Sequence, residues 1–197
     1  MASSFTALFA GDLGFGEHYL HHPRAPTLQR MLQAEGYGAS LAGLTPQIRS
    51  ADVAIGNLEA PLSSVPDPGL AGRKRGLTWS DPEPAVAALA EAGFSALSLA
   101  NDHALDCGRP GLADTRRLLA GAGIHAFGAG ADRETAGRPF VTRFRSGGRV
   151  RTLVVFGMLE YRELYDRRFC WYTNPGLPGV NPMSPRWLES RIDALSR

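Results

Sequence analysis

Residues 95–108 read SALSLANDHALDCG, and this stretch joins a short apolar run to a polar cluster. The run 95–100 has the length and composition of a buried strand. Asn101, Asp102 and His103 follow it directly, and Asp106 comes three residues later. In open α/β sheets, ligands bind at the carboxyl ends of the strands. The stretch therefore predicts a strand that delivers polar side chains to a binding site.

Two earlier stretches repeat this pattern. An apolar run at 5–10 precedes Asp12, and a run at 53–55 precedes Asn57 and Glu59. Each polar residue alone is more typical of a turn or a cap, and it is the repetition that favours a site. Carboxylates and an imidazole that meet at neighbouring strand ends suit a hard or borderline divalent metal. The predicted metal ligands are Asp12, Glu59, Asp102 and His103, with Asn57 and Asn101 as supporting residues.

The rest of the chain alternates between helical and strand patterns. A Pro after Ser80-Asp81 and a Gly at 93 are typical of the start and the end of a helix. The residues Ser146-Gly147-Gly148-Arg149 between two apolar runs predict a hairpin. Alternating strands and helices predict an α/β layered domain. The expected helices are 40–50, 82–93, 110–122, 132–136 and 185–197, and the further strands are 124–127, 139–144 and 150–156.

The amino-acid composition excludes several classes of protein. The 197 residues, 44% hydrophobic and 20% charged, suit one globular domain. Lys and Arg number 21 against 19 Asp and Glu, a net charge of +2 that gives no electrostatic case for nucleic acid. The two cysteines make no disulfide framework and suit a reducing compartment. The chain carries neither a signal-peptide pattern nor an apolar run of about 20 residues. These features predict a cytoplasmic protein without a membrane span.

Five segments in order resemble one protein family. They are 11–13 (GDL), 56–62 (GNLEAPL), 98–108 (SLANDHALDCG), 111–115 (GLADT) and 128–130 (GAG). The chain is similar to the bacterial poly-γ-glutamate capsule-synthesis (CapA) proteins, which in turn resemble calcineurin-like metallophosphoesterases.

The resemblance implies a layered α/β sandwich around a centre of two divalent metals, such as Mn, Fe, Zn or Mg. It makes Asp12 and Glu59 metal carboxylates, and it places Asp102 and His103 where the related enzymes have a metal-binding Asn and a His beside the leaving oxygen. We predict His103 and Asp106 as the catalytic pair, with Asp106 orienting the imidazole.

Two departures from the family pattern shape the functional hypothesis. The usual Ala-Asn-Asn-His motif is Ala-Asn-Asp-His here, so Asp102 adds a negative charge. The later His-Trp-Gly and Gly-His-His-Pro-His motifs have no counterpart, and no histidine follows His125. We therefore expect residues 1–197 to form a single domain that corresponds to the N-terminal half of the family fold and is truncated at its C-terminus.

The resemblance suggests a metal-dependent hydrolase-like protein that acts on an anionic ester or a polyanionic polymer, with activity depending on completion of the site. The alternative is a non-catalytic half domain or binding subunit. Exposed apolar surface on a half sandwich would favour self-association or a complementing C-terminal half.

Other candidate residues have simpler interpretations. His18, His21 and His22 have a chelating spacing, but loop histidines are the favoured reading. Cys107 lies four residues after His103, and buried packing is favoured over a nucleophilic thiol. The basic run 73–75 is typical of a solvated loop, with a hold on an anionic substrate as the alternative.

Overall fold

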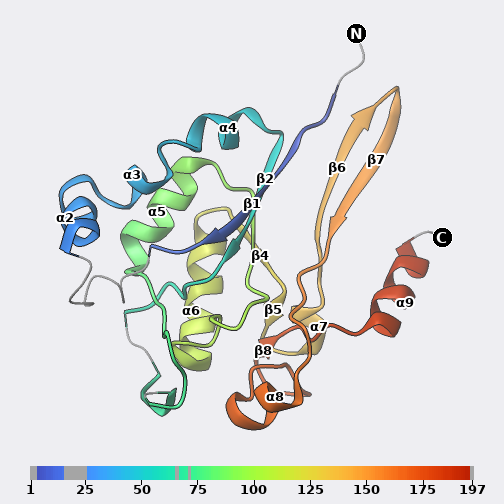
Figure 1. The fold of residues 1–197 in the computed structure, drawn as a ribbon. Coiled ribbons are helices and arrows are strands. Elements are labelled where there is room, and N and C mark those ends of the chain that lie inside the picture. The colour runs from blue at the N-terminus through green and yellow to red at the C-terminus, as the bar shows by residue number, and fades with distance from the viewer. Residues whose placement is uncertain (1–3, 16–25, 65–66, 71, 196–197) are drawn as a thin grey trace.

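The computed structural model describes residues 4–15, 26–64, 67–70 and 72–195. Its centre is a parallel sheet with the strand order β1-β2-β3-β4 (Figure 1). The strands run in the order of the chain, so each one lies beside the next. Their bounds are Ala7–Leu13 for β1, Val53–Leu58 for β2, Ala96–Ser98 for β3 and His125–Phe127 for β4.

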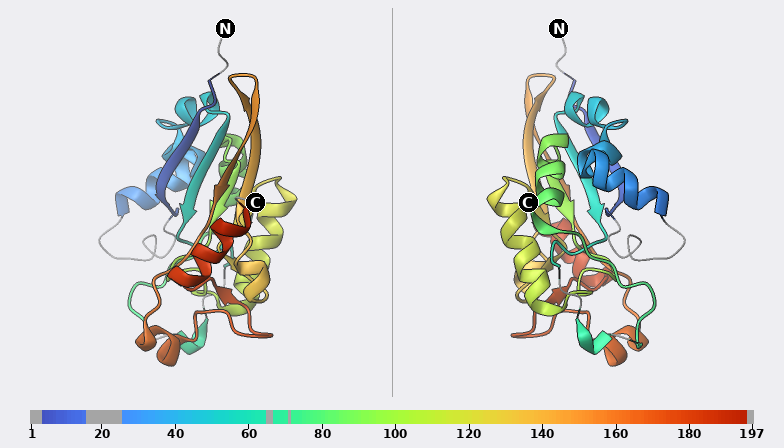
Figure 2. Two further views of the ribbon diagram at one scale, coloured as in Figure 1. Left: turned by 90° about the vertical axis from the view of Figure 1, so that its right-hand side faces the viewer. Right: turned by 90° about the vertical axis from the view of Figure 1, so that its left-hand side faces the viewer.

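Helices cover one face of the sheet, and a two-stranded hairpin covers the other (Figures 1 and 2). The hairpin consists of β6 (Phe140–Ser146) and β7 (Arg149–Val155). The other elements are α2 (Pro26–Glu35), α3 (Tyr37–Leu41), α4 (Thr45–Ser50), the 3₁₀ turn η1 (Pro68–Leu70), α5 (Pro82–Ala92), α6 (Gly108–Gly121), β5 (Ala129–Gly130), α7 (Arg133–Ala136), α8 (Glu163–Phe169), β8 (Gly179–Val180) and α9 (Pro185–Leu195).

Strand β2 shows why the two faces have separate cores. Side chains alternate along a strand, so Val53 and Ile55 pack on the hairpin side while Ala54 and Leu58 pack on the helix side. All four are buried. A strand covered on both faces is apolar throughout, which explains the continuous apolar run at the start of this strand.

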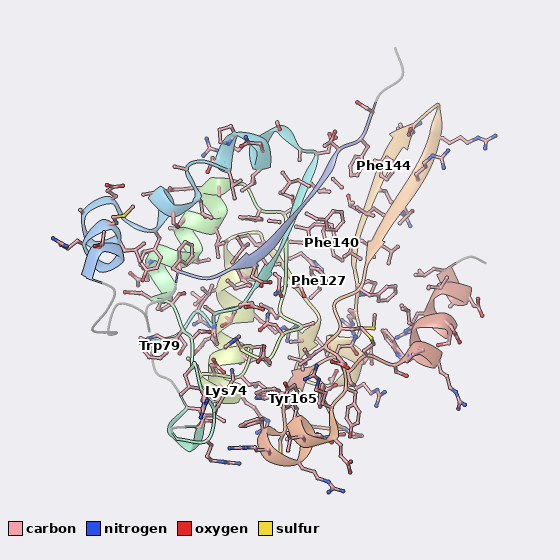
Figure 3. All side chains as sticks on the ribbon, viewed as in Figure 1. Lys74, Trp79, Phe127, Phe140, Phe144 and Tyr165 are labelled. Carbon is pink, nitrogen blue, oxygen red and sulfur yellow. The ribbon has the colours of Figure 1, made fainter. Side chains whose placement is uncertain are left out.

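Aromatic side chains fill the space between the sheet and the hairpin. Phe127, Phe140 and Phe144 lie along this space (Figure 3). The rings of Phe127 and Phe140 are 6.4 Å apart, and Phe144 stacks on Phe5 at 3.9 Å. The hairpin turns at Gly147-Gly148 with both φ angles positive, the conformation of the tight turn that matches strand twist. The second layer therefore depends on aromatic packing along β6 and on the two glycines that form the turn.

The structure confirms the predicted layered α/β class, with a parallel four-stranded sheet flanked by helices. The predicted helix at 82–93 is α5, which ends at Gly93 with φ of 99°. The prediction of one helix over 40–50 is wrong, because two short helices, α3 and α4, are separated by a turn at 42–44. Helix α8 was not predicted; it is only seven residues long, and no side chain caps its start. No helix in the described ranges is long and apolar enough to cross a bilayer.

Candidate functional site

A cavity of about 430 Å³ opens at the carboxyl ends of β1 and β2 and at the loop that follows β3. The four predicted metal ligands all contribute to its wall. The lining residues are Asp12, Leu13, Gly14, Glu59, Ala60, Arg75, Gly76, Thr78, Asp102 and His103. The parallel order of the strands explains the convergence, because three consecutive strands end at the same edge of the sheet.

Three carboxylates form what we call the carboxylate rim: Asp12, Glu59 and Asp102. Asp12 is exposed, Glu59 is half-buried, and the side chain of Asp102 is 42% exposed. Burial raises the pKa of Glu59 above its ordinary value, and the negative charge of Asp12 raises it further. The charge of Asp102 acts in the same direction, and His103 opposes it. The rim thus gathers like charges that repel one another.

Two asparagines connect the rim to the sheet. Asn57 donates from Nδ2 to Asp12 Oδ1 at 2.8 Å and to Glu59 Oε1 at 3.2 Å. Asn101 donates from Nδ2 to Asn57 Oδ1 at 3.0 Å and to the Leu58 carbonyl at 2.8 Å. The Oδ1 of Asn101 accepts from the His103 backbone N–H at 3.1 Å. This chain of hydrogen bonds places the polar ends of β1, β2 and β3 relative to one another.

Below the rim lies a second set of polar residues, which we call the buried network: Lys74, Thr78, His103 and Asp106. The Asp106 side chain is fully buried, and Lys74 is 6% exposed. Asp106 Oδ1 accepts from Lys74 Nζ at 2.5 Å, and Oδ2 accepts from the Thr78 backbone N–H at 2.7 Å. His103 Nδ1 lies 2.8 Å from Asp106 Oδ2. Each oxygen of this buried carboxylate therefore has a hydrogen-bonding partner.

The imidazole of His103 connects the two sets. Its Nδ1 faces Asp106, while its Nε2 lies 3.9 Å from Asp102 Oδ1 on the rim. The side chain is 20% exposed and lines the cavity. His103 can therefore exchange a proton with a molecule in the cavity through Nε2 while Nδ1 stays held from below.

The donor atoms of the rim suit a divalent cation, but their grouping is not that of a complete metal site. Carboxylate oxygens are the donors that hard cations prefer. A cation would offset the charges of Asp12 and Asp102, which add to the effect of burial on the pKa of Glu59. However, no three His, Cys, Asp or Glu side chains in the described ranges stand together as a ready metal-binding group. The rim therefore has oxygen donors of the kind that a cation prefers, without the grouping of a ready metal site among the described residues.

The basic run 73–75 was predicted to be a solvated loop, and the structure agrees for only part of it. Arg73 and Arg75 are exposed, but Lys74 is buried against Asp106, and Arg75 lines the cavity. Sequence reasoning missed Lys74 because nothing local distinguishes it from its two neighbours. The only signal was Asp106 itself, since a carboxylate buried beside a strand end needs a cationic partner.

The remaining candidates are less informative. Cys107 is buried, and burial raises the pKa of its thiol to about 12, which agrees with packing rather than nucleophilic chemistry. Gly128 joins β4 to β5 with a positive φ of 83°, a backbone conformation that glycine adopts without strain. His18, His21 and His22 lie outside the described residues.

Comparison with known proteins agrees with the motifs. A model of the family described as bacterial capsule synthesis protein PGA_cap matches residues 6–196. A Mycobacterium tuberculosis protein named "Probable polyglutamine synthesis accessory protein" is 35% identical, over 64% of this chain and 39% of that relative. The capsule biosynthesis protein CapA of Bacillus anthracis is 27% identical over 64% of this chain and 28% of its own length. The PGA biosynthesis protein CapA of Bacillus subtilis is 24% identical over 91% and 42%. The chain thus spans less than half the length of these relatives.

Proposed function

This chain belongs to the family of bacterial capsule synthesis proteins, and from that membership we propose that its cavity binds a divalent cation and an anionic substrate. The carboxylate rim holds the cation through Asp12, Glu59 and Asp102, with His103 beside them. The substrate is an anionic ester or the end of a polyanionic polymer, such as the PGA to which the name of the Bacillus subtilis relative refers. The activity proposed is hydrolysis of that substrate.

One observation carries the proposal. Three carboxylates line a single cavity, and burial, with the charges of Asp12 and Asp102 in addition, raises the pKa of Glu59. A fold retains such an arrangement at a cost in stability, and perturbed carboxylates in a cleft are typical of functional sites. A bound divalent cation supplies a Lewis acid and lowers the pKa of a bound water.

The other residues of the cavity have roles that follow from their positions. Arg75 lines the same cavity as the negatively charged rim, and its guanidinium holds an anionic group of the substrate. His103 presents Nε2 towards the rim and is held at Nδ1 by Asp106. It can therefore give a proton to a leaving oxygen or stabilise the charge that develops there.

The proposal is tested by titrating the purified chain with Mn²⁺ in a calorimeter, beside the Asp12→Ala and His103→Ala variants. We expect saturable binding that is weakened at least tenfold by Asp12→Ala. Asp114→Ala is the matched control, because it removes an exposed carboxylate on α6 that pairs only with Arg117 among the hydrogen bonds of the described chain. Wild-type binding that is absent, or that survives Asp12→Ala unchanged, would contradict the cation site.

A second candidate function is a non-catalytic binding subunit of the same fold. It is favoured by the lack of a ready group of three metal ligands in the described part of the chain. Hydrolysis of p-nitrophenyl phosphate in saturating Mn²⁺ separates the two candidates. Turnover that is lost in His103→Ala supports the hydrolase. Cation binding without any turnover supports the binding subunit.

A further inference from the structure

We propose that the far end of the β6–β7 hairpin docks on a bilayer that contains anionic phospholipids. This surface lies outside the proposed function, because it is at the opposite end of the sheet from the cavity. Its chemistry comes from four arginines near the turn of the hairpin. We call them the basic ribbon: Arg143, Arg145, Arg149 and Arg151.

The small net charge of the chain conceals a separation of charge. The segment 139–159 holds the four arginines of the basic ribbon and contains neither Asp nor Glu. The whole chain carries +2 and the ribbon carries +4, so the other residues together carry −2. All four arginines are exposed. Within the described part of the chain, Arg143, Arg149 and Arg151 form no ion pair with a carboxylate.

The arginines lie on both faces of the hairpin and surround its turn. Phe144 of β6 points to the side of the sheet, where it stacks on an aromatic ring of the N-terminal segment. Side chains alternate along a strand, so Arg143 and Arg145 point away from the sheet. Arg151 lies opposite Phe144 in the ladder, so Arg149 and Arg151 share the face of Phe144. The turn extends past the start of β2 (Figures 1 and 2), which leaves both faces open there.

The basic ribbon and the carboxylate rim stand at opposite ends of β1. Phe144 of the hairpin contacts Phe5, just before β1 begins, whereas Asp12 enters the rim near the end of that strand. A strand rises about 3.3 Å per residue, so the two charged regions are about 20 Å apart. An extended anionic surface attracts the ribbon and repels the rim. It would therefore orient the molecule with the cavity away from the surface.

Apolar side chains among the arginines favour a phospholipid surface over a nucleic acid. Val150 is 60% exposed and Val141 is 47% exposed. Val150 lies opposite Arg145 in the ladder, so both valines share the outer face with Arg143 and Arg145. The headgroup region of a bilayer offers phosphates that match a guanidinium and acyl carbon that covers an apolar side chain. The backbone of a nucleic acid offers the phosphates without the acyl carbon.

The test is sedimentation of the purified chain with vesicles of phosphatidylcholine, with and without about 30% phosphatidylserine, at about 50 mM NaCl. We expect binding to the anionic vesicles only, and its loss at about 500 mM NaCl. The double variant Arg143→Gln/Arg149→Gln should bind at least about tenfold more weakly, because each arginine adds to the attraction. The matched control is Arg117→Gln/Arg167→Gln, which removes the same charge from two exposed ion pairs on α6 and α8 and should bind like the wild type.

Two further measurements separate a bilayer from other anionic partners. Val150→Ser keeps every charge and should still weaken binding to the anionic vesicles, by at least about twofold. A DNA duplex of about 20 base pairs at the same salt concentration should bind more weakly than the vesicles do.

Four results would overturn the proposal: equal binding to neutral and anionic vesicles, an equal loss in the control variant, unchanged binding by Val150→Ser, or tighter binding to the duplex. The wild-type chain alone decides the first and the last of these. The Mn²⁺ titration of Arg143→Gln/Arg149→Gln should match that of the wild type, because the ribbon is remote from the rim. Failure of the docking proposal would therefore leave the proposed function standing, and absent Mn²⁺ binding would refute the proposed function alone.

Discussion

The buried network and the carboxylate rim lie next to each other and balance their charges in opposite ways. In the buried network, Asp106 has Lys74, Thr78 and His103 as partners, and none of its side chain is exposed. In the rim, Asp12 and Glu59 share the single amide of Asn57, and their repulsion contributes to the raised pKa of Glu59.

This difference indicates that the buried network has its hydrogen-bonding partners in place, whereas the carboxylate rim does not. Both oxygen atoms of the buried Asp106 carboxylate already have partners, and displacing one of them would leave a buried polar group unpaired. The network therefore serves to hold His103. A partly exposed group of carboxylates has oxygen atoms to spare and gains from a cation. The predictions that follow test this division, from the largest effect on stability to the smallest.

We expect Asp106→Ala to destabilise the fold far more than Asp12→Ala does. Removing Asp106 leaves the Lys74 ammonium buried without its carboxylate, and breaking a buried pair in this way costs about 3–5 kcal/mol. Asp12 is exposed, and its loss should change the free energy of unfolding by about 0.5 kcal/mol or less. Urea denaturation of both variants measures the two values. Equal losses would show that the rim is as structural as the network.

Thiol labelling compares a cysteine beside the buried network with an exposed cysteine at the end of α8 and needs no mutation. Cys107 follows Asp106 directly and is buried with its pKa raised to about 12, whereas Cys170 is exposed. Because the thiolate is the reacting form, we expect Cys107 to react about a thousandfold more slowly with iodoacetamide at about pH 8. Mass spectrometry of the peptides over time gives both rates. Rapid labelling of Cys107 in the native chain would mean that the buried network opens readily.

The pH dependence of stability should report on Glu59. Its pKa in the folded chain is raised above the ordinary value of 4.5, so the folded state holds a proton that the unfolded state has already lost. The stability associated with this proton is present below about pH 4.5 and is lost as the pH rises through the folded pKa. Glu59→Gln should therefore raise the urea midpoint at about pH 7 relative to its effect at about pH 4.5. A variant that lowers the midpoint at neutral pH would show that Glu59 is favourably paired.

The smallest effect is expected for an ion pair on the surface. Arg117 pairs with Asp114 at 3.0 Å on α6, and both side chains are more than half exposed. Such pairs contribute about 0.2–1 kcal/mol and are screened by salt. We expect Arg117→Ala to lower the free energy of unfolding by no more than about 0.5 kcal/mol at low salt, and by less in 1 M NaCl. A loss as large as that of Asp106→Ala would show that exposed and buried ion pairs contribute equally to the stability of this fold.

Much of the fold could be predicted from the sequence because it depends on local patterns. The apolar run 53–55, the Pro and Gly that bound α5, and the two glycines of the hairpin turn each act over a few residues. The predictions failed where length or context decided the outcome. Helices α3 and α4 share a spacing that looks continuous, and α8 is stabilised by contacts of Tyr165 and Phe169 with Trp171 rather than by a capping residue.

The sequence by itself determined which residues gather at the strand ends, since Asp12, Glu59 and the 101–106 segment each follow an apolar run in a parallel order. Only the tertiary structure decided which of these side chains are buried in ion pairs and which are exposed to the cavity. Lys74 and Asp106 lie 32 residues apart in the chain. They meet because the segment 72–78 lies against the loop that follows β3, with Thr78 bonded to both Asp106 and the Glu59 carbonyl. Burial and ion pairing depend on contacts between residues far apart in the sequence, so a local sequence pattern does not predict them.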